Sequence, residues 1–191
     1  GIGYSKFKGV KNGVRAESLA FVPVNDNCEV TRLVVANDSS EEKNISIFSY
    51  VEWCLWNADD DSRNFQRNFS TGEVEVKGSA IYHKTEYRER RNHYAVYSVN
   101  APITAFDTAR DSFLGLYHYA ADPEAVLNGR LTNSIASGWS PIAAHQLDVT
   151  LKPGESKDVE LEVPYRRFAM WDKDMRFGVE EGWFEVWLGR D

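Results

Sequence analysis

The chain has 191 residues, which is enough for one substantial hydrophobic core and too few for two, so we expect one domain with at most an appendage. Apolar residues make up 42% of it and aromatic residues 13%, a composition that excludes a disordered chain. The formal net charge of −7 excludes a general nucleic-acid binder, because such a surface repels the phosphate backbone.

No apolar run approaches the ~20 residues of a membrane-spanning helix, so we expect no membrane partner. Cys28 and Cys54 stand far apart and lack the neighbours of a CxxC site. The sequence predicts that both are small buried thiols rather than a disulfide, which is typical of a reducing compartment.

Hydrophobic residues recur with a period of two along most of the chain. In "NISIFSYVEW" (44–53) one face carries Ile45, Ile47, Ser49, Val51 and Trp53, and the other carries Phe48 and Tyr50. Similar alternation marks 73–83, 93–100, 143–151, 157–164 and 183–188. Turn formers separate such runs at 11–13, 25–27, 37–40, 128–129 and 153–154. The pattern predicts ten to twelve short strands in an all-β antiparallel β-sandwich, and only Asp122–Leu127 suggests a helical turn.

Tests for catalytic and metal motifs fail. The sequence has no G-x-S-x-G nucleophile elbow and no phosphate-binding glycine loop. Asn57, Asp59 and Asp61 match the first, third and fifth positions of a calcium loop, but Ser62 replaces its glycine and Asn68 its glutamate. We therefore expect no metal site. The histidines are expected to be hydrogen-bonded polar residues rather than ligands: His83, His93, His118 and His145.

Two polar stretches remain, "ADDDSRNFQRNFSTGE" (58–73) and "HKTEYRERRNH" (83–93). Their mixed charges fit an ion-paired, solvated strand face. They also fit a polyol site, because arginine and glutamine can make paired hydrogen bonds to vicinal hydroxyls while aromatic rings supply flat apolar faces. The candidate rings are Trp53, Trp56, Phe65, Tyr87 and Trp139. The residues alone leave both interpretations open.

The same stretches carry a family resemblance. "FSYVEWCLWNADDDSRNFQRNFSTGEVEVKGSAIYHKTEYRERRNHYAVYSVNAPI", "DSFLGLY" and "SIASGWSPIAAHQLDVTLKPGES" resemble the N-terminal β-sandwich domain of glycoside hydrolase family 94, the cellobiose phosphorylase family. The likeness runs from residue 1 to about 157. It implies a sandwich of the supersandwich, galactose-mutarotase-like type that starts at an internal point of the family's domain and leaves sheet edges open.

This resemblance implies a carbohydrate-active, cytoplasmic, homodimeric enzyme. The family splits cellobiose with inorganic phosphate, as co-substrate and without a cofactor, into α-glucose 1-phosphate and glucose with inversion. Its general acid and phosphate site lie in an (α/α)6 barrel that this chain lacks, so no catalytic residue is expected here and glucose or cellobiose would bind only with that barrel or a partner chain. In the family, the "NFQRN" loop contacts the acceptor-side glucose, which implies sugar-binding roles for Gln66 and Arg67, with Asp59 to Asp61 holding the loop.

Residues 158–191 depart from that family. "LKPGESKDVELEVPYRRFAMWDKDMRFGVEEGWFEVWLGRD" is similar to the end of the fibronectin type III-like domain of family 3 β-glucosidases, and its strands would complete the sandwich or form an appendage. The main interpretation is a non-catalytic module of a cellobiose-phosphorylase-like enzyme that contributes acceptor contacts and a dimer interface. The alternatives are a structural fibronectin-like accessory domain and a chimeric or designed sandwich without activity.

Overall fold

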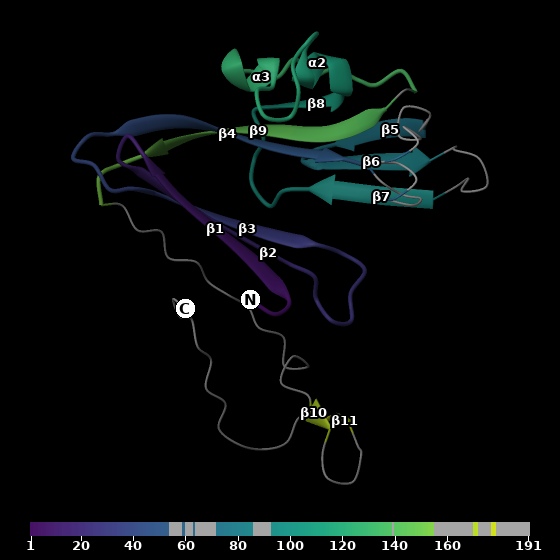
Figure 1. The fold of residues 1–191 in the computed structure, drawn as a ribbon, viewed down its shortest axis with the longest axis horizontal. Helices are drawn as coiled ribbons and strands as arrows, with labels where there is room; N and C mark the ends of the chain where they lie inside the picture. Colours follow the sequence, from purple (N-terminus) through teal and green to yellow (C-terminus); the bar gives the residue numbers. More distant parts are fainter. Residues whose placement is uncertain are drawn as a thin grey trace. The chain divides into compact units, whose positions relative to one another are not determined.

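A computed structural model describes residues 1–53, 59, 63, 72–85, 93–138, 140–154, 170–171 and 177–178. These residues form eleven strands and two short helices, and every strand pair is antiparallel (Figure 1). The predicted all-β antiparallel class is therefore confirmed. The chain divides into two compact units, Gly1–Glu155 and Ser156–Asp191.

The central sheet of the first unit has the strand order β4 (Lys43–Glu52), β9 (Pro141–Leu151) and β8 (Ala105–Ala109). Helices α2 (Arg110–Leu114) and α3 (Glu124–Leu127) cover one face of this sheet in Figure 1. The cluster beneath them consists of Phe113, Leu114, Ala125, Leu131, Ile142 and Ala144, with Phe48, Tyr50 and Ala105 packed against it. The prediction that Phe48 and Tyr50 share one face of β4 is confirmed.

The second sheet covers the opposite face of β4 and β9, and consists of β5 (Gly72–Lys77), β6 (Ala80–Thr85) and β7 (His93–Ser98). Its core contains Trp53, Ile81 and Ala143, flanked by Val51, Val74, Val76, Ala95, Tyr97 and Phe106. The run 73–83 was expected as one alternating stretch, but it is a hairpin. Gly78 makes the turn with φ of +61°, a conformation that favours glycine.

The third sheet consists of β1 (Tyr4–Lys11), β2 (Val14–Phe21) and β3 (Val30–Asn37). The predicted turn at 11–13 is confirmed, since Asn12 and Gly13 both have positive φ between β1 and β2. The buried Asn37 ties this sheet to β9 by donating from Nδ2 to the Leu151 carbonyl at 2.9 Å.

Two sequence expectations are wrong. Cys28 is a free, exposed thiol rather than a buried one, because it lies in the connection between β2 and β3, outside the sheets. Helix α2 was not predicted, because five residues are too few to show a helical period. Cys54 and the expected strands at 157–164 and 183–188 lie outside the described residues.

The second unit contains one described strand pair, β10 (Met170–Trp171) with β11 (Phe177–Gly178). Across the described part of the chain, no helix has the length and apolar character that crossing a membrane requires.

Candidate functional site

The two predicted sugar-binding residues, Gln66 and Arg67, lie outside the described residues, as do Trp56, Phe65, Tyr87 and Trp139. Within segment 54–71 the structure describes Asp59 and Arg63, which form an i,i+4 ion pair at 3.7 Å. Both side chains are more than three-quarters exposed. This pair fits the expected local role of Asp59, but an exposed pair of this kind adds little stability.

The residues on either side of segment 54–71, Trp53 and Gly72, lie at one end of the sandwich. Ladder pairing places Glu52 opposite Ile142, Ala109 opposite Pro141 and Gly72 opposite Thr85. Thr85 in turn lies opposite His93, so segment 86–92 also starts and finishes at this end. We call this region the β4–β5 end, defined by Glu52, Trp53, Gly72, His83 and Arg110. Both polar stretches singled out in the sequence connect to it.

At this end a buried histidine ring contacts both residues that flank segment 54–71. The ring of His83 stacks on Trp53 with a centroid separation of 5.5 Å and an interplanar angle of 20°. It also lies directly over the backbone of Gly72, where a methyl group would come within 2.5 Å of His83 Cε1. Glycine is therefore required at position 72 by close approach.

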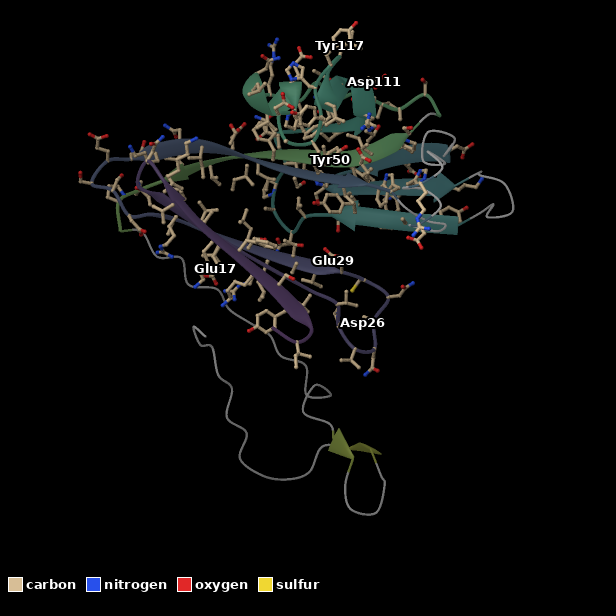
Figure 2. The ribbon with its side chains drawn as sticks, viewed as in Figure 1. Glu17, Asp26, Glu29, Tyr50, Asp111 and Tyr117 are labelled. Atoms are coloured by element: carbon tan, nitrogen blue, oxygen red, sulfur yellow. The ribbon has the colours of Figure 1, made fainter. Side chains whose placement is uncertain are left out.

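A polar cluster lies on the other face of β4. Arg110 donates from Nε to Glu52 Oε1 at 2.9 Å, and the Tyr50 hydroxyl donates to the same oxygen. Tyr50 lies beneath the helices (Figure 2) and stacks on Phe113 at 4.5 Å. Burial lowers the pKa of Arg110, but the hydrogen bond and charge of Glu52 outweigh this, so the net shift is upward. The pair fastens α2 to the end of β4.

The loop that follows α3 also makes contacts that hold the start of β5. Asp107 is fully buried, and its Oδ1 accepts four hydrogen bonds at 2.8–3.2 Å from the backbone and hydroxyl groups of Thr132 and Ser134. The same loop continues to Gly138, whose carbonyl accepts from the Gly72 amide at 3.3 Å. Asp107 thus helps to fix the start of β5.

By distance and angle, the expected hydrogen bonds of the strand histidines are absent at both ring nitrogens of His83 and present at one ring nitrogen of His145. Both side chains are fully buried. Neither ring nitrogen of His83 has a hydrogen-bond partner among the described residues, whereas His145 Nδ1 contacts Ser49 Oγ at 3.2 Å and Nε2 has none. Burial lowers the pKa of both rings, and the backbones of Glu73 and Ser79 oppose the shift. His118 does behave as expected, bonding Asp122.

Sequence reasoning missed Glu52 and Arg110, which are 58 positions apart and share no motif. It could have found His83, because the alternation Ile81, His83 places that ring on the same face as a buried isoleucine. Among the described residues, no three histidine, cysteine or acidic side chains gather where a metal ion could bind. The described residues instead form a packed frame that includes the residues flanking both polar segments.

Comparison with known proteins identifies the type of domain. A sequence model described as the supersandwich domain of glycosyl hydrolase 94 matches residues 1–162. A second, described as a fibronectin type III-like domain, matches residues 148–191, so the two matches overlap.

Curated relatives are similar over the first part of the chain. An N,N'-diacetylchitobiose phosphorylase from Vibrio proteolyticus is 34% identical over 159 residues, and one from Vibrio furnissii is 31% identical over 157 residues. A solabiose phosphorylase from Paenibacillus borealis is 28% identical over 160 residues. Each alignment covers 81% of this chain and 20% of the relative, so the chain spans about a fifth of the length of these relatives.

Proposed function

The chain belongs to the glycosyl hydrolase 94 family through its supersandwich domain, and from this membership we propose that it is the non-catalytic sandwich module of a disaccharide phosphorylase. The observation that carries the proposal is the family match over residues 1–162, together with relatives that are named as phosphorylases of disaccharides. Catalysis then belongs to a further domain or chain, and the module supplies contacts to the sugar.

The β4–β5 end is the proposed sugar-facing part of the module. Segment 54–71, which contains Gln66 and Arg67, is attached there at both ends. An arginine fork makes paired hydrogen bonds to neighbouring hydroxyls, and a glutamine amide both donates and accepts. We assign these two residues to the acceptor-side sugar, in a site that a catalytic domain or the second subunit of a homodimer completes.

In the complete enzyme, inorganic phosphate is the proposed co-substrate and no cofactor is needed. The module's contribution is to hold the acceptor sugar in place, which lowers the entropy cost of the reaction. The proposal places the enzyme in the cytoplasm, and the net charge of −7 argues against a nucleic-acid partner. Cellobiose is the first substrate to test, and N,N'-diacetylchitobiose is the second because two relatives carry its name.

The test is complementation of phosphorolysis. The 191-residue chain, incubated alone with cellobiose or N,N'-diacetylchitobiose and phosphate, is expected to release no sugar 1-phosphate. Added to a family 94 phosphorylase from which the sandwich has been deleted, it is expected to restore release. Production of sugar 1-phosphate by the chain alone would contradict the non-catalytic assignment.

Point variants then test the sugar contacts. Arg67→Ala is expected to weaken restoration by about tenfold or more, since a hydrogen bond to a charged group contributes roughly 1.5–3 kcal/mol. Gln66→Ala is expected to have a smaller effect. Arg32→Ala is the matched control, because Arg32 is an exposed arginine of β3 in a different sheet. Equal losses of restored activity for Arg67→Ala and Arg32→Ala would contradict the acceptor-site role of Arg67.

A second candidate function is a structural accessory domain without a sugar site. The match of residues 148–191 to a fibronectin type III-like domain favours it. Complementation separates the two, because a purely structural module restores activity equally well with Arg67→Ala and with the unchanged sequence.

A further inference from the structure

The outer edge of β4 is open along the first half of the strand. β4 lies at the edge of its sheet, which has the order β4–β9–β8. On the other side of β9, the Thr104 amide donates to the Gln146 carbonyl at 2.7 Å, and the Asp148 amide donates to Thr104 Oγ1 at 3.2 Å. The backbone groups of Gln146 and Asp148 therefore point toward β8, and those of the alternate residues, such as Leu147, point toward β4.

The same alternation decides which residues of β4 face outward. Ile47 lies opposite Leu147 and bonds to β9, so its neighbours along β4 direct their backbone N–H and C=O groups away from the sheet. In the first half of the strand these outward residues are Asn44, Ser46 and Phe48. Their outward backbone groups have no hydrogen-bond partner among the described residues.

The two edges of this sheet differ in protection. At β8 the loop that follows α3 bonds the outward amides: Thr108 N donates to the Ser134 carbonyl at 2.9 Å, and Phe106 N donates to Asn133 Oδ1 at 3.0 Å. Edge strands are usually protected by such a cover, or by lysine, proline or a bulge. Residues 44–51 contain no charged residue and no proline, and β4 pairs with β9 in an unbroken register. The edge of β4 is therefore suited to pairing with another strand.

The layers that cover the sheet leave this half of β4 clear. Asn44 and Ser46 are exposed, and the cluster under the helices begins at Phe48. On the opposite face the core beneath β5–β6–β7 begins at Val51, and the first half of β4 extends past these strands in Figure 1. A strand brought alongside residues 44–48 therefore meets neither layer.

We propose that residues 44–48 pair antiparallel with the same residues of a second copy of the chain, about a twofold axis at Ser46. Ser46 is the middle one of the three outward residues, so this register places it opposite Ser46 of the second copy and places Asn44 opposite Phe48. All three residues then exchange backbone hydrogen bonds across the axis. On the other face, Ile45 lies opposite Ile47 of the second copy, and such cross-strand apolar pairs stabilise a sheet.

The side chains of this half of β4 match those of a second copy. No charged side chain lies opposite another in this register. The half-buried Ile45 and Ile47 lie beside Val149 and Leu147 of β9 in one apolar group, in which Val149 is 37% exposed. A second copy brings the same apolar group to the axis, so both copies bury apolar surface.

The contact has a defined size and a defined limit. A twofold contact uses each open edge once, so association stops at the dimer. A paired segment of five residues is short, and we expect a dissociation constant in the micromolar range or weaker. The contact is independent of the proposed sugar role, because it uses neither segment 54–71 nor the β4–β5 end.

Sedimentation velocity of the 191-residue chain provides the first test. The unchanged chain is expected to shift from monomer toward dimer between about 10 and 300 µM. Ser46→Lys places two ammonium groups opposite each other and is expected to weaken dimerisation about tenfold or more. Thr150→Lys is the matched control, because Thr150 is exposed on the same face but belongs to β9, away from the edge. A chain that stays monomeric over this range, or equal losses in the two variants, overturns the proposal.

Disulfide cross-linking tests the register. Hydrogen-bonded residues directly opposite each other have Cα atoms about 5.5 Å apart, which is within reach of a disulfide. Ser46→Cys is therefore expected to form a covalent dimer with oxidised glutathione at least about tenfold faster than Asn44→Cys, whose two copies lie roughly 13 Å apart along the strands. Both variants carry Cys28→Ser, so that the exposed Cys28 thiol does not react. Equal rates for the two variants overturn the register centred on Ser46.

Amide exchange of the unchanged chain separates a second copy from other occupants of the edge. The outward amides of Asn44, Ser46 and Phe48 are expected to become protected only as the protein concentration rises, whereas those of Ile45 and Ile47 are protected throughout. Protection of the outward amides that does not change with concentration would show that another segment of the same chain occupies the edge, and would overturn the proposal.

Discussion

Strands β9 and β3 differ in burial although both have apolar, β-branched sequences. The first six residues of β9, from Pro141 to Gln146, are all buried, whereas only Asn37 of β3 is. Strand β9 lies in the middle of a sheet covered by helices on one face and by β5–β6–β7 on the other, and β3 is the last strand of its sheet. Burial follows from the layers above and below a strand rather than from its own sequence.

The β1–β2–β3 sheet exposes apolar side chains to solvent, and lysines on the same edge strand discourage pairing with a second chain. Phe7 is 68% exposed and Val10 is 70% exposed on β1. The same strand carries Lys6, Lys8 and Lys11, and lysines on an edge strand discourage pairing with a second chain. The central sheet relies on packing for its stability, and this outer sheet relies on backbone ladders and surface charge.

The largest expected difference is in the free energy of unfolding, when one phenylalanine is replaced in the central core and one in the β1–β2–β3 sheet. Phe113→Ala removes a ring that is 1% exposed and stacked on Tyr50, so it should lower the free energy of unfolding by about 3–5 kcal/mol. Phe7→Ala removes a largely exposed ring and should cost less than about 1 kcal/mol. Urea denaturation followed by circular dichroism measures both. Similar losses would mean that the two sheets are equally well packed.

A smaller but still large effect is expected at Asp107. Asp107→Ala leaves the donors of Thr132 and Ser134 without their acceptor. Because Thr132 is exposed and Ser134 is half-buried, water can replace part of what is lost, so the total cost should be about 1–3 kcal/mol. The loop that holds Gly72 through Gly138 should loosen as well. Denaturation and amide exchange at Gly72 measure the two effects. Asp107→Asn is the control, because it keeps the accepting oxygen and should cost less.

Local sequence patterns predicted the class of the fold, and the missed features depend on contacts between distant residues. Alternation in 44–53 predicted correctly that Phe48 and Tyr50 oppose Val51 and Trp53, because side-chain direction follows directly from strand geometry. The Glu52–Arg110 pair joins residues 58 positions apart, and the exposure of Cys28 depends on which layers are absent around it. Neither leaves a local pattern. The predicted sugar contacts at Gln66 and Arg67 remain a prediction.

The next prediction concerns pH, because the central core and the β1–β2–β3 sheet should lose stability in different pH ranges. Burial lowers the pKa of His83 and His145, so the unfolded chain binds more protons below its histidine pKa of about 6.5. The free energy of unfolding of the central core should therefore fall as the pH drops below 6.5, by up to about 1.4 kcal/mol per pH unit for each histidine. Urea denaturation at pH 7.5, 6.5 and 5.5 measures the slope. A flat profile would mean that water or a charge reaches these rings.

The smallest effect is expected in the outer sheet, at Glu17. A hydrogen bond from Lys8 at 2.9 Å lowers the pKa of Glu17, and the charge of Lys6 adds to the shift. Stability from a carboxyl of lowered pKa is present above its unfolded value and is lost as the pH falls through its folded value, so this contribution disappears only below about pH 4.3. Glu17→Gln should change stability least of all these variants, and 1 M salt should reduce the change further because exposed pairs are screened. Salt-insensitive destabilisation by Glu17→Gln, measured by urea denaturation at pH 7, would show that Glu17 supports this sheet through packing rather than through charge.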